Sequence, residues 1–337
     1  MAGMRHIVMV LAAAALACGV AAAPPAKAGR RAAAAARKGP PPQTGKPAPK
    51  GAGPLAPYRG AIALDAGTRR VLFADHADRT AFPASVTKLM TFLLVLEDIA
   101  AGRCALADRV AGSAYAASME PSRVGLLPGQ TMSVEDLLFA LMVKSANDGA
   151  VALAEHAAWI HGGGRGPVPP AADSRALVRA FVARMNRRAR ALGMASTRYE
   201  SPNGLPPGRE EARGFDTSTA RDVATLCCAL VRIDGALRFT SAAARTVTAG
   251  DGRPLFLATH NYFLPGSRDR DGYARPVPGC DGLKTGYTMA SGSSIALTAA
   301  RGARRVVVVV LGSAGRSARE AAAGQILQDA LGALAVW

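Results

Sequence analysis

The sequence predicts an α/β protein of the α+β type, with one antiparallel sheet built from both chain ends and a large helical insertion between them. Strand-like runs lie near 58–74 and 294–312, and apolar residues at helical spacing dominate the stretch between. Of the 337 residues, 50% are hydrophobic and 19% are charged. That much apolar material can bury a sizeable core and excludes wholesale disorder.

The first 28 residues have the pattern of an export signal. Arg5 and His6 precede an uninterrupted apolar run at 7–17, and small residues lead up to Ala28, after which we expect cleavage. The run is well short of the roughly 20 residues that span a bilayer; Cys18 leaves a lipid-modified N-terminus as an alternative. We therefore expect a protein of the periplasm or cell wall. An exported chain without a nucleic-acid motif is not expected to bind nucleic acid.

Residues 29–57 predict an extended basic tether. They contain seven prolines and six Lys/Arg and no acidic residue, within a chain of net charge +17. Such a segment is extended and partly polyproline in character. It serves either as a solvated linker or as an electrostatic contact with an anionic wall or membrane surface.

The folded part is expected to begin near Tyr58 as one catalytic domain, 58–337. Short strands at 58–65 and 70–74 surround Ala66-Gly67, which predicts a hairpin. Helices are predicted from apolar spacing at 85–101, 134–160, 176–192 and 219–231. For the last of these helices, Ser218 is the expected N-cap.

The chain closes with strands and a helix. Strands are predicted at 294–300 and 305–312, joined by a tight turn at Gly302, and a helix at 317–334. The loops near 161–174 and 264–278 have the composition of insertions.

Lysine usage draws attention to three positions. The chain has seven lysines against thirty-four arginines, and the expected folded part retains only Lys88, Lys144 and Lys284. Arginine cannot be deprotonated in a protein, whereas a buried lysine can lose its proton and act as a base. The residues around each lysine therefore indicate whether it has a chemical role.

Ser85 lies three residues before Lys88, at the predicted start of a helix. Residues i and i+3 share a helix face, so the two side chains can meet. A serine hydroxyl becomes a good nucleophile when a neighbour takes its proton, and a desolvated lysine can do so. The alternative is an ordinary N-capping serine.

Two further motifs carry polar groups in unusual places. Ser145-Ala146-Asn147 interrupts an apolar helical segment, where a second hydroxyl could relay protons and an amide could hold a carbonyl; a satisfied core pair is the alternative. Lys144 beside it is expected to be an exposed helix lysine. Lys284-Thr285-Gly286 is expected on a strand, where Lys and Thr can bind a carboxylate and Gly286 lets another backbone approach. An extended peptide could pair along this edge.

Ser-x-x-Lys, Ser-x-Asn and Lys-Thr-Gly, in this order, are the signature of penicillin-binding proteins and serine β-lactamases. Over about 58–335 the chain resembles the low-molecular-mass D-alanyl-D-alanine carboxypeptidases. The resemblance includes the stretches PASVTKLMT, LLFALMVKSANDGAVALAEH, SPNGL, STARDV and DGLKTGYT. It implies the β-lactamase/penicillin-binding transpeptidase-like fold.

The resemblance also implies a role for each motif. Ser85 would attack the carbonyl between the two terminal D-alanines of a peptidoglycan stem peptide, with Lys88 as general base and Ser145 as proton relay. Asn147 would hold the substrate amide. Lys284 and Thr285, beside Gly286, would bind the terminal carboxylate of the stem peptide or of an inhibitory β-lactam. No metal and no cofactor is implied.

Other features are interpreted without a role in the chemistry. His156 and His161 have no zinc-site company and are expected to be structural or superficial. Outside the signal, the cysteines at 104, 227, 228 and 280 are expected to be buried thiols. A Cys104–Cys280 disulfide is the alternative that export permits.

Compared with the family pattern, Ser-Ala-Asn replaces the commoner Ser-Gly-Asn, and the 264–278 loop could reshape substrate access. The chain ends at Trp337, so we expect neither the β-rich C-terminal domain nor the amphipathic anchor of many relatives. Three other functions remain open. A D,D-endopeptidase would share every motif. A serine β-lactamase would need a deacylating acid, for which only Glu210 and Glu211 offer themselves. A non-catalytic wall-binding module would have a broken motif.

Overall fold

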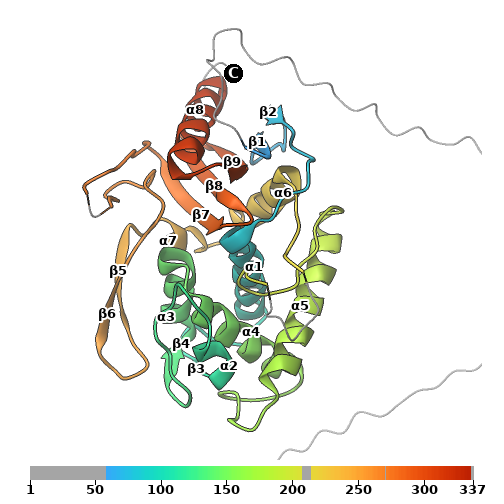
Figure 1. Cartoon of the computed structure of the whole chain (residues 1–337), viewed down its shortest axis with the longest axis vertical. Coiled ribbons are helices and arrows are strands. Elements are labelled where there is room, and N and C mark those ends of the chain that lie inside the picture. The colour runs from blue at the N-terminus through green and yellow to red at the C-terminus, as the bar shows by residue number, and fades with distance from the viewer. Residues whose placement is uncertain (1–57, 207–213, 270, 335–337) are drawn as a thin grey trace, which may run out of the picture. The chain divides into compact units, whose positions relative to one another are not determined.

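The computed structural model describes residues 58–206, 214–269 and 271–334 (Figure 1). The predicted export signal, the basic tether and the pair Glu210 and Glu211 lie outside the described residues. Within these ranges the chain combines helices with antiparallel strands, so the predicted fold class is confirmed.

One five-stranded antiparallel sheet joins the two ends of the folded part. Its order is β2-β1-β9-β8-β7. The strands are β1 (Gly60–Asp65), β2 (Val71–Asp75), β7 (Cys280–Thr288), β8 (Gly292–Arg301) and β9 (Arg304–Ser313). Strand β1 pairs with β9 in a register that places Ile62 opposite Val309. The predicted hairpin of β1 and β2 and the sheet built from both chain ends are therefore confirmed.

The side chains of strand β9 pack against helices on both faces of the sheet. Val306, Val308 and Val310 pack in one core with helix α8 (Arg316–Leu334), whereas Val307 and Val309 join the larger core that includes α6 (Ala220–Leu230). All five valines are fully buried. A strand covered on both sides becomes a continuous apolar run instead of an alternating one.

Between the two halves of the sheet lies the helical insertion, with two small hairpins that were not predicted. Its elements are η1 (Ala84–Thr87), α1 (Lys88–Ala100), α2 (Ala114–Ala117), α3 (Val134–Phe139), η2 (Ala140–Lys144), α4 (Asn147–His161), α5 (Ser174–Ala191), α6 and α7 (Leu237–Thr240). The hairpins are β3 (Arg109–Ala111) with β4 (Thr131–Ser133), and β5 (Ala244–Thr248) with β6 (Pro254–Ala258). Strands of three to five residues offer too few alternations to predict from periodicity.

The predicted helix at 134–160 is wrong as a continuous element. A turn of π-helix, η2, ends at Ser145, which has left-handed backbone angles of φ 63° and ψ 34°, and α4 begins anew at Asn147. Apolar spacing continues through the break, so periodicity cannot detect it.

The N-cap predicted for α6 is also corrected. Thr219, not Ser218, accepts the backbone hydrogen bond from Asp222, at 3.1 Å. The Ser218 hydroxyl instead lies 2.8 Å from the Thr197 hydroxyl. Both hydroxyls suit a cap chemically, but α6 begins at Ala220, which makes Thr219 the residue that precedes its first turn.

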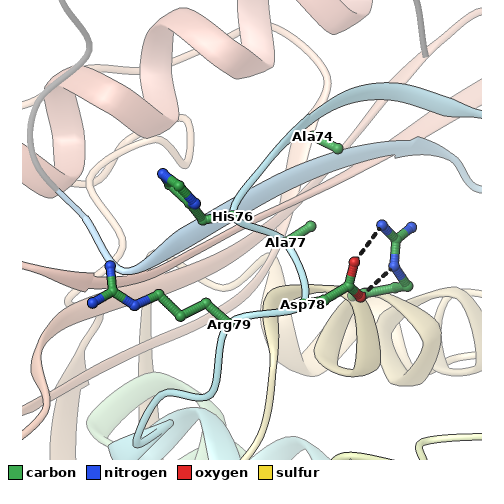
Figure 2. A pocket seen from close by; sticks show the side chains of 6 residues that line it. Ala74, His76, Ala77, Asp78 and Arg79 are labelled. Carbon is green, nitrogen blue, oxygen red and sulfur yellow. Dashed lines mark hydrogen bonds and ion pairs between the residues drawn. The ribbon is translucent and has the colours of Figure 1, made fainter. Parts of the chain in front are cut away.

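The segment that leaves β2 is tied to α6 at the surface. Asp78 accepts two hydrogen bonds from the Arg221 guanidinium, at 2.6 and 3.0 Å. Figure 2 shows this ion pair beside His76 and Arg79, at an open hollow of about 570 Å³. Asp78 is largely exposed, so the pair adds little stability and mainly fixes the path of the chain.

The four cysteines predicted as buried thiols are free and buried. Burial raises the pKa of the Cys104 and Cys280 thiols to about 12, which keeps both protonated. Across the described ranges, every helix is too short or too polar to cross a membrane.

Candidate active site

Ser85 and Lys88 meet where η1 passes into α1. Ser85 lies in the short 3-10 turn, Lys88 is the first residue of α1, and Lys88 Nζ donates a hydrogen bond of 2.9 Å to Ser85 Oγ. Ala84, just before the serine, has a left-handed φ of 49°. Strain of this kind in a residue without a special side chain is characteristic of functional sites. The i, i+3 contact expected from the sequence is therefore present.

The Lys88 amine is enclosed. It donates 2.7 Å hydrogen bonds to Asn147 Oδ1 and to the backbone oxygen of Asn203, and the residue is 0% exposed. Burial, and then the charge of Lys284, hold the pKa of Lys88 well below its ordinary value, while Asp216 and Asp148 oppose this shift. The amine can therefore be neutral under conditions in which an exposed lysine stays charged.

The break before α4 places Asn147 and Ser145. Asn147 begins α4 with its side chain on Lys88, and its Nδ2 donates 3.0 Å to the backbone oxygen of Glu120. Ser145 is 6% exposed, two residues earlier. Within the described residues its hydroxyl has no hydrogen-bond partner, so the structure does not join it to Ser85 or Lys88. Lys144 is half-buried, not exposed as predicted.

The segment facing this break is held by an aspartate that sequence reasoning passed over. Asp148 is fully buried and accepts backbone hydrogen bonds from Val124, Gly125 and Leu126, at 2.9 to 3.2 Å. In addition, the backbone N–H of Asn147 donates 2.7 Å to the oxygen of Ser122. One wall of the site is thereby fixed to the residues that carry Ser-Ala-Asn.

The Lys-Thr-Gly motif lies on β7, the edge strand beside η1. A Cβ added to Gly286 would stand 2.8 Å from Pro83 O and 3.1 Å from the Ser85 nitrogen. The close approach predicted at this glycine therefore exists, and the approaching backbone is the turn that bears the serine. Lys284 and Thr285 are both buried.

Lys284 lies near a second buried cation that the sequence did not identify. Burial, and then the charge of Arg319 on α8, lower the pKa of Lys284 to about 7. Arg319 is 5% exposed and donates 2.8 Å to Glu320 Oε1. Glu320 balances the charge of Arg319, so Lys284, with the Thr285 hydroxyl next to it in the chain, is the group here that is suited to bind an anion.

The loop at 201–205 is the other component that the sequence marked only as a landmark. Its Asn203 oxygen accepts from Lys88, and its Pro202 oxygen accepts 2.6 Å from Thr91 Oγ1. Gly204 has φ +87°, and a Cβ there would collide with the carbonyl of Ala84. The Asn-Gly pair was the available signal, because such pairs mark tight turns.

The two histidines have separate environments. His161 Nε2 lies 2.8 Å from Asp98 Oδ1, and Asp98 also pairs with Arg184 and Arg103. His156 is buried, and burial lowers its pKa. Among the described residues, neither histidine forms a hydrogen bond with a motif residue.

Substituting Gly204 tests the packing of this loop on the nucleophile turn. Gly204→Ala should destabilise the fold by about 3 kcal/mol, from a left-handed alanine and from overpacking. Gly163→Ala is a matched control, since Gly163 has the same φ of +87° and open space around it; it should cost about 1 kcal/mol. Urea unfolding measures both, and equal losses would contradict the contact.

Comparison with known proteins agrees with this arrangement. Residues 56–315 match a family model described as D-alanyl-D-alanine carboxypeptidase. The chain is 29% identical over 272 residues to D-alanyl-D-alanine carboxypeptidase DacF of Bacillus subtilis, covering 81% of this chain and 61% of the relative. The chain thus spans about three fifths of the length of this relative.

Solved structures give the same result. Penicillin-binding protein 6B from Escherichia coli superposes with a TM-score of 0.67 at 28% identity, covering 86% of this chain and 80% of that one. A mutant of the Streptomyces K15 DD-transpeptidase superposes at 0.68 with 25% identity, covering 83% and 100%. The resemblance inferred from the three motifs is confirmed: the chain belongs to the D-alanyl-D-alanine carboxypeptidase family.

Proposed function

We propose that this chain is a serine D-alanyl-D-alanine carboxypeptidase that removes the terminal D-alanine from peptidoglycan stem peptides through an acyl-enzyme. The observation that carries the proposal is the 2.9 Å contact between Ser85 Oγ and a fully buried Lys88 amine. A neutral amine at this distance can accept the hydroxyl proton as the oxygen attacks a carbonyl. Residues 58–337 form the catalytic domain in this proposal.

In this mechanism Ser85 Oγ bonds to the carbonyl carbon between the two D-alanines, and its proton passes to Lys88. The peptide C–N bond then breaks, the proton reaches the leaving amine through Lys88 and Ser145, and D-alanine departs. Water hydrolyses the ester and restores Ser85. Ser145 is assigned the relay because it lies buried beside Asn147, whose side chain contacts Lys88.

Asn147 is suited to hold the substrate amide. Its Oδ1 is occupied by Lys88, and one of the two hydrogens on Nδ2 is directed to Glu120 O. The second hydrogen remains for a substrate carbonyl oxygen.

The terminal carboxylate would bind at β7, where Lys284 and Thr285 lie beside Gly286. The buried charge of Lys284 supports an anion at this place. A β-lactam carboxylate would take the same position, so penicillins should acylate Ser85. The chemistry assigned to these residues requires no cofactor, and the substrate is a wall peptide, not nucleic acid.

A transpeptidase activity is the second candidate, favoured by the similarity to the Streptomyces K15 DD-transpeptidase. It would pass the same acyl group to an amine instead of water. A D,D-endopeptidase would differ in the peptide that acylates Ser85, and a β-lactamase in how fast the penicilloyl ester is hydrolysed.

Mass spectrometry after incubation with benzylpenicillin tests the proposed nucleophile. The wild type should gain one penicilloyl mass that persists, and Ser85→Ala should gain none because no other side chain occupies the position of the attacking oxygen. Release of D-alanine from a pentapeptide, together with no cleavage of a cross-linked dimer substrate, would then support the carboxypeptidase. Rapid drug turnover without an adduct would indicate a β-lactamase, and no reaction with either compound would refute the proposal.

The pH profile of acylation tests the anion site. The second-order rate constant reports the free enzyme, so it should fall above about pH 7, where Lys284 loses its charge since its pKa is lowered to about 7. Lys284→Arg should keep the rate constant level to about pH 10, because a guanidinium stays protonated. Lys144→Arg is the matched control and should retain the wild-type fall. Identical alkaline limbs in the wild type and Lys284→Arg would contradict the assignment.

We further propose that the chain is exported and that residues 29–57 contact an anionic wall or membrane surface, on the basis of their charge. Deleting 29–57 should abolish sedimentation of the mature protein with anionic lipid vesicles or with isolated cell walls at low salt. Raising the salt should release the full-length protein, because exposed charges are screened. Unchanged sedimentation after the deletion would refute the contact.

A further inference from the structure

A buried carboxylate lies next to the nucleophile and base, and the mechanism above does not use it. Asp216 is 2% exposed and follows Phe215, whose ring stacks on Phe82 with centroids 5.0 Å apart. Backbone bridges join Thr217 to Arg198 and Ser218 to Ala81. The aspartate is therefore held at a fixed place beside η1.

One side of the carboxylate binds the helix that carries Lys88. Thr87 Oγ1 donates a hydrogen bond of 2.6 Å to Asp216 Oδ2. Thr87 is fully buried and directly precedes Lys88 in the chain. The contact therefore fixes the start of α1, from which the amine projects toward Ser85.

The other side of the carboxylate binds the loop that receives the amine. Asp216 Oδ1 accepts from the backbone N–H of Glu200 at 2.6 Å and of Ser201 at 3.0 Å. The Ser201 hydroxyl in turn accepts from Gly204 N at 3.0 Å, and Asn203 O accepts from Lys88 at 2.7 Å. One carboxylate therefore holds both the helix start from which Lys88 projects and the loop whose Asn203 oxygen accepts a hydrogen bond from the Lys88 amine.

We propose that Asp216 is a positioning residue of the active site: it holds Lys88 from two sides, through Thr87 and through the 201–204 loop, and places a negative charge beside the amine. The proposal rests on the proposed function, because the positioned group is its general base. Both sets of hydrogen bonds end on the same carboxylate group.

The charge of Asp216 acts on Lys88 in a defined direction. A nearby carboxylate favours the ammonium form, so Asp216 raises the pKa of Lys88 against burial and Lys284. Burial in turn raises the pKa of Asp216 itself to about 6, with Glu200 contributing in the same direction. Burial, and then the charge of Asp216, raise the pKa of the Tyr199 phenol well above its ordinary value, so the phenol stays neutral.

The test is the pH dependence of acylation by benzylpenicillin. Asp216→Asn removes the charge, so the acid limb of the profile should move down by about one pH unit. The maximal rate constant should also fall roughly tenfold, a factor equivalent to one weakened hydrogen bond among those that position the base. Asp216→Glu keeps the charge with a longer reach; it should lose rate while its acid limb stays in place. A purely structural role would lower the rate in both variants and move neither limb, which would overturn the proposal.

If Asp216→Asn does not fold, an NMR titration of Lys88 in the wild-type protein tests the proposal instead. The full chain has seven lysines, so carbon-13 labelled lysine gives few signals, and Lys88→Arg identifies the one from Lys88. In the wild type this signal should show a second inflection near pH 6, where Asp216 takes up its proton. A single inflection would overturn the proposal. If penicillin forms no Ser85 adduct, the proposed function fails, yet this titration still decides whether Asp216 acts on Lys88.

Discussion

The burial of one amine organises the site. Lys88 is completely enclosed, and its nitrogen contacts Ser85 in the adjoining turn η1, Asn147 at the start of α4 and Asn203 on a loop. An enclosed charged amine is costly unless it is paired or loses its proton. When the amine is neutral, its two hydrogens can remain on the oxygens of Asn147 and Asn203, and its lone pair can then accept from the Ser85 hydroxyl, which is the arrangement a general base needs. They also tie three segments, remote in sequence, to one atom.

The sheet serves this arrangement by bringing β7 against the nucleophile turn. β7 lies at the edge because β8 and β9 continue the sheet from β1, so the pairing of the two chain ends supports the strand that carries the Lys-Thr-Gly motif beside η1. Gly286 permits the contact, since any side chain there would meet Pro83 and Ser85. The nucleophile therefore sits between a strand edge and the Gly204 loop, both of which need glycine for steric reasons.

Electrostatics divides the site into two parts. Lys88 is surrounded by groups that satisfy it without a direct ion pair, and the carboxylates Asp216 and Asp148 only moderate the loss of its proton. Lys284, by contrast, is affected chiefly by burial and then by the charge of Arg319, which is itself paired with Glu320. In the proposed function, one of these buried lysines acts as the base and the other as the partner of an anion. The difference comes from neighbours that lie far from each lysine in the chain.

The fold class, the sheet from both ends, the three motifs and the Ser85–Lys88 contact could all be predicted from the sequence. Those features depend on local spacing, on apolar periodicity and on the i, i+3 geometry of a helix, all of which can be read from neighbouring residues. The helix break at Ser145, the cap at Thr219 and the positions of Asp216, Asn203 and Arg319 near the motifs became visible only in the folded chain. Each of these depends on contacts between residues distant in the chain: Asp216 meets Thr87 across 129 positions. Hydrogen bonds of that kind cannot be detected from periodicity, because the two partners are close in space but follow no repeating spacing along the chain.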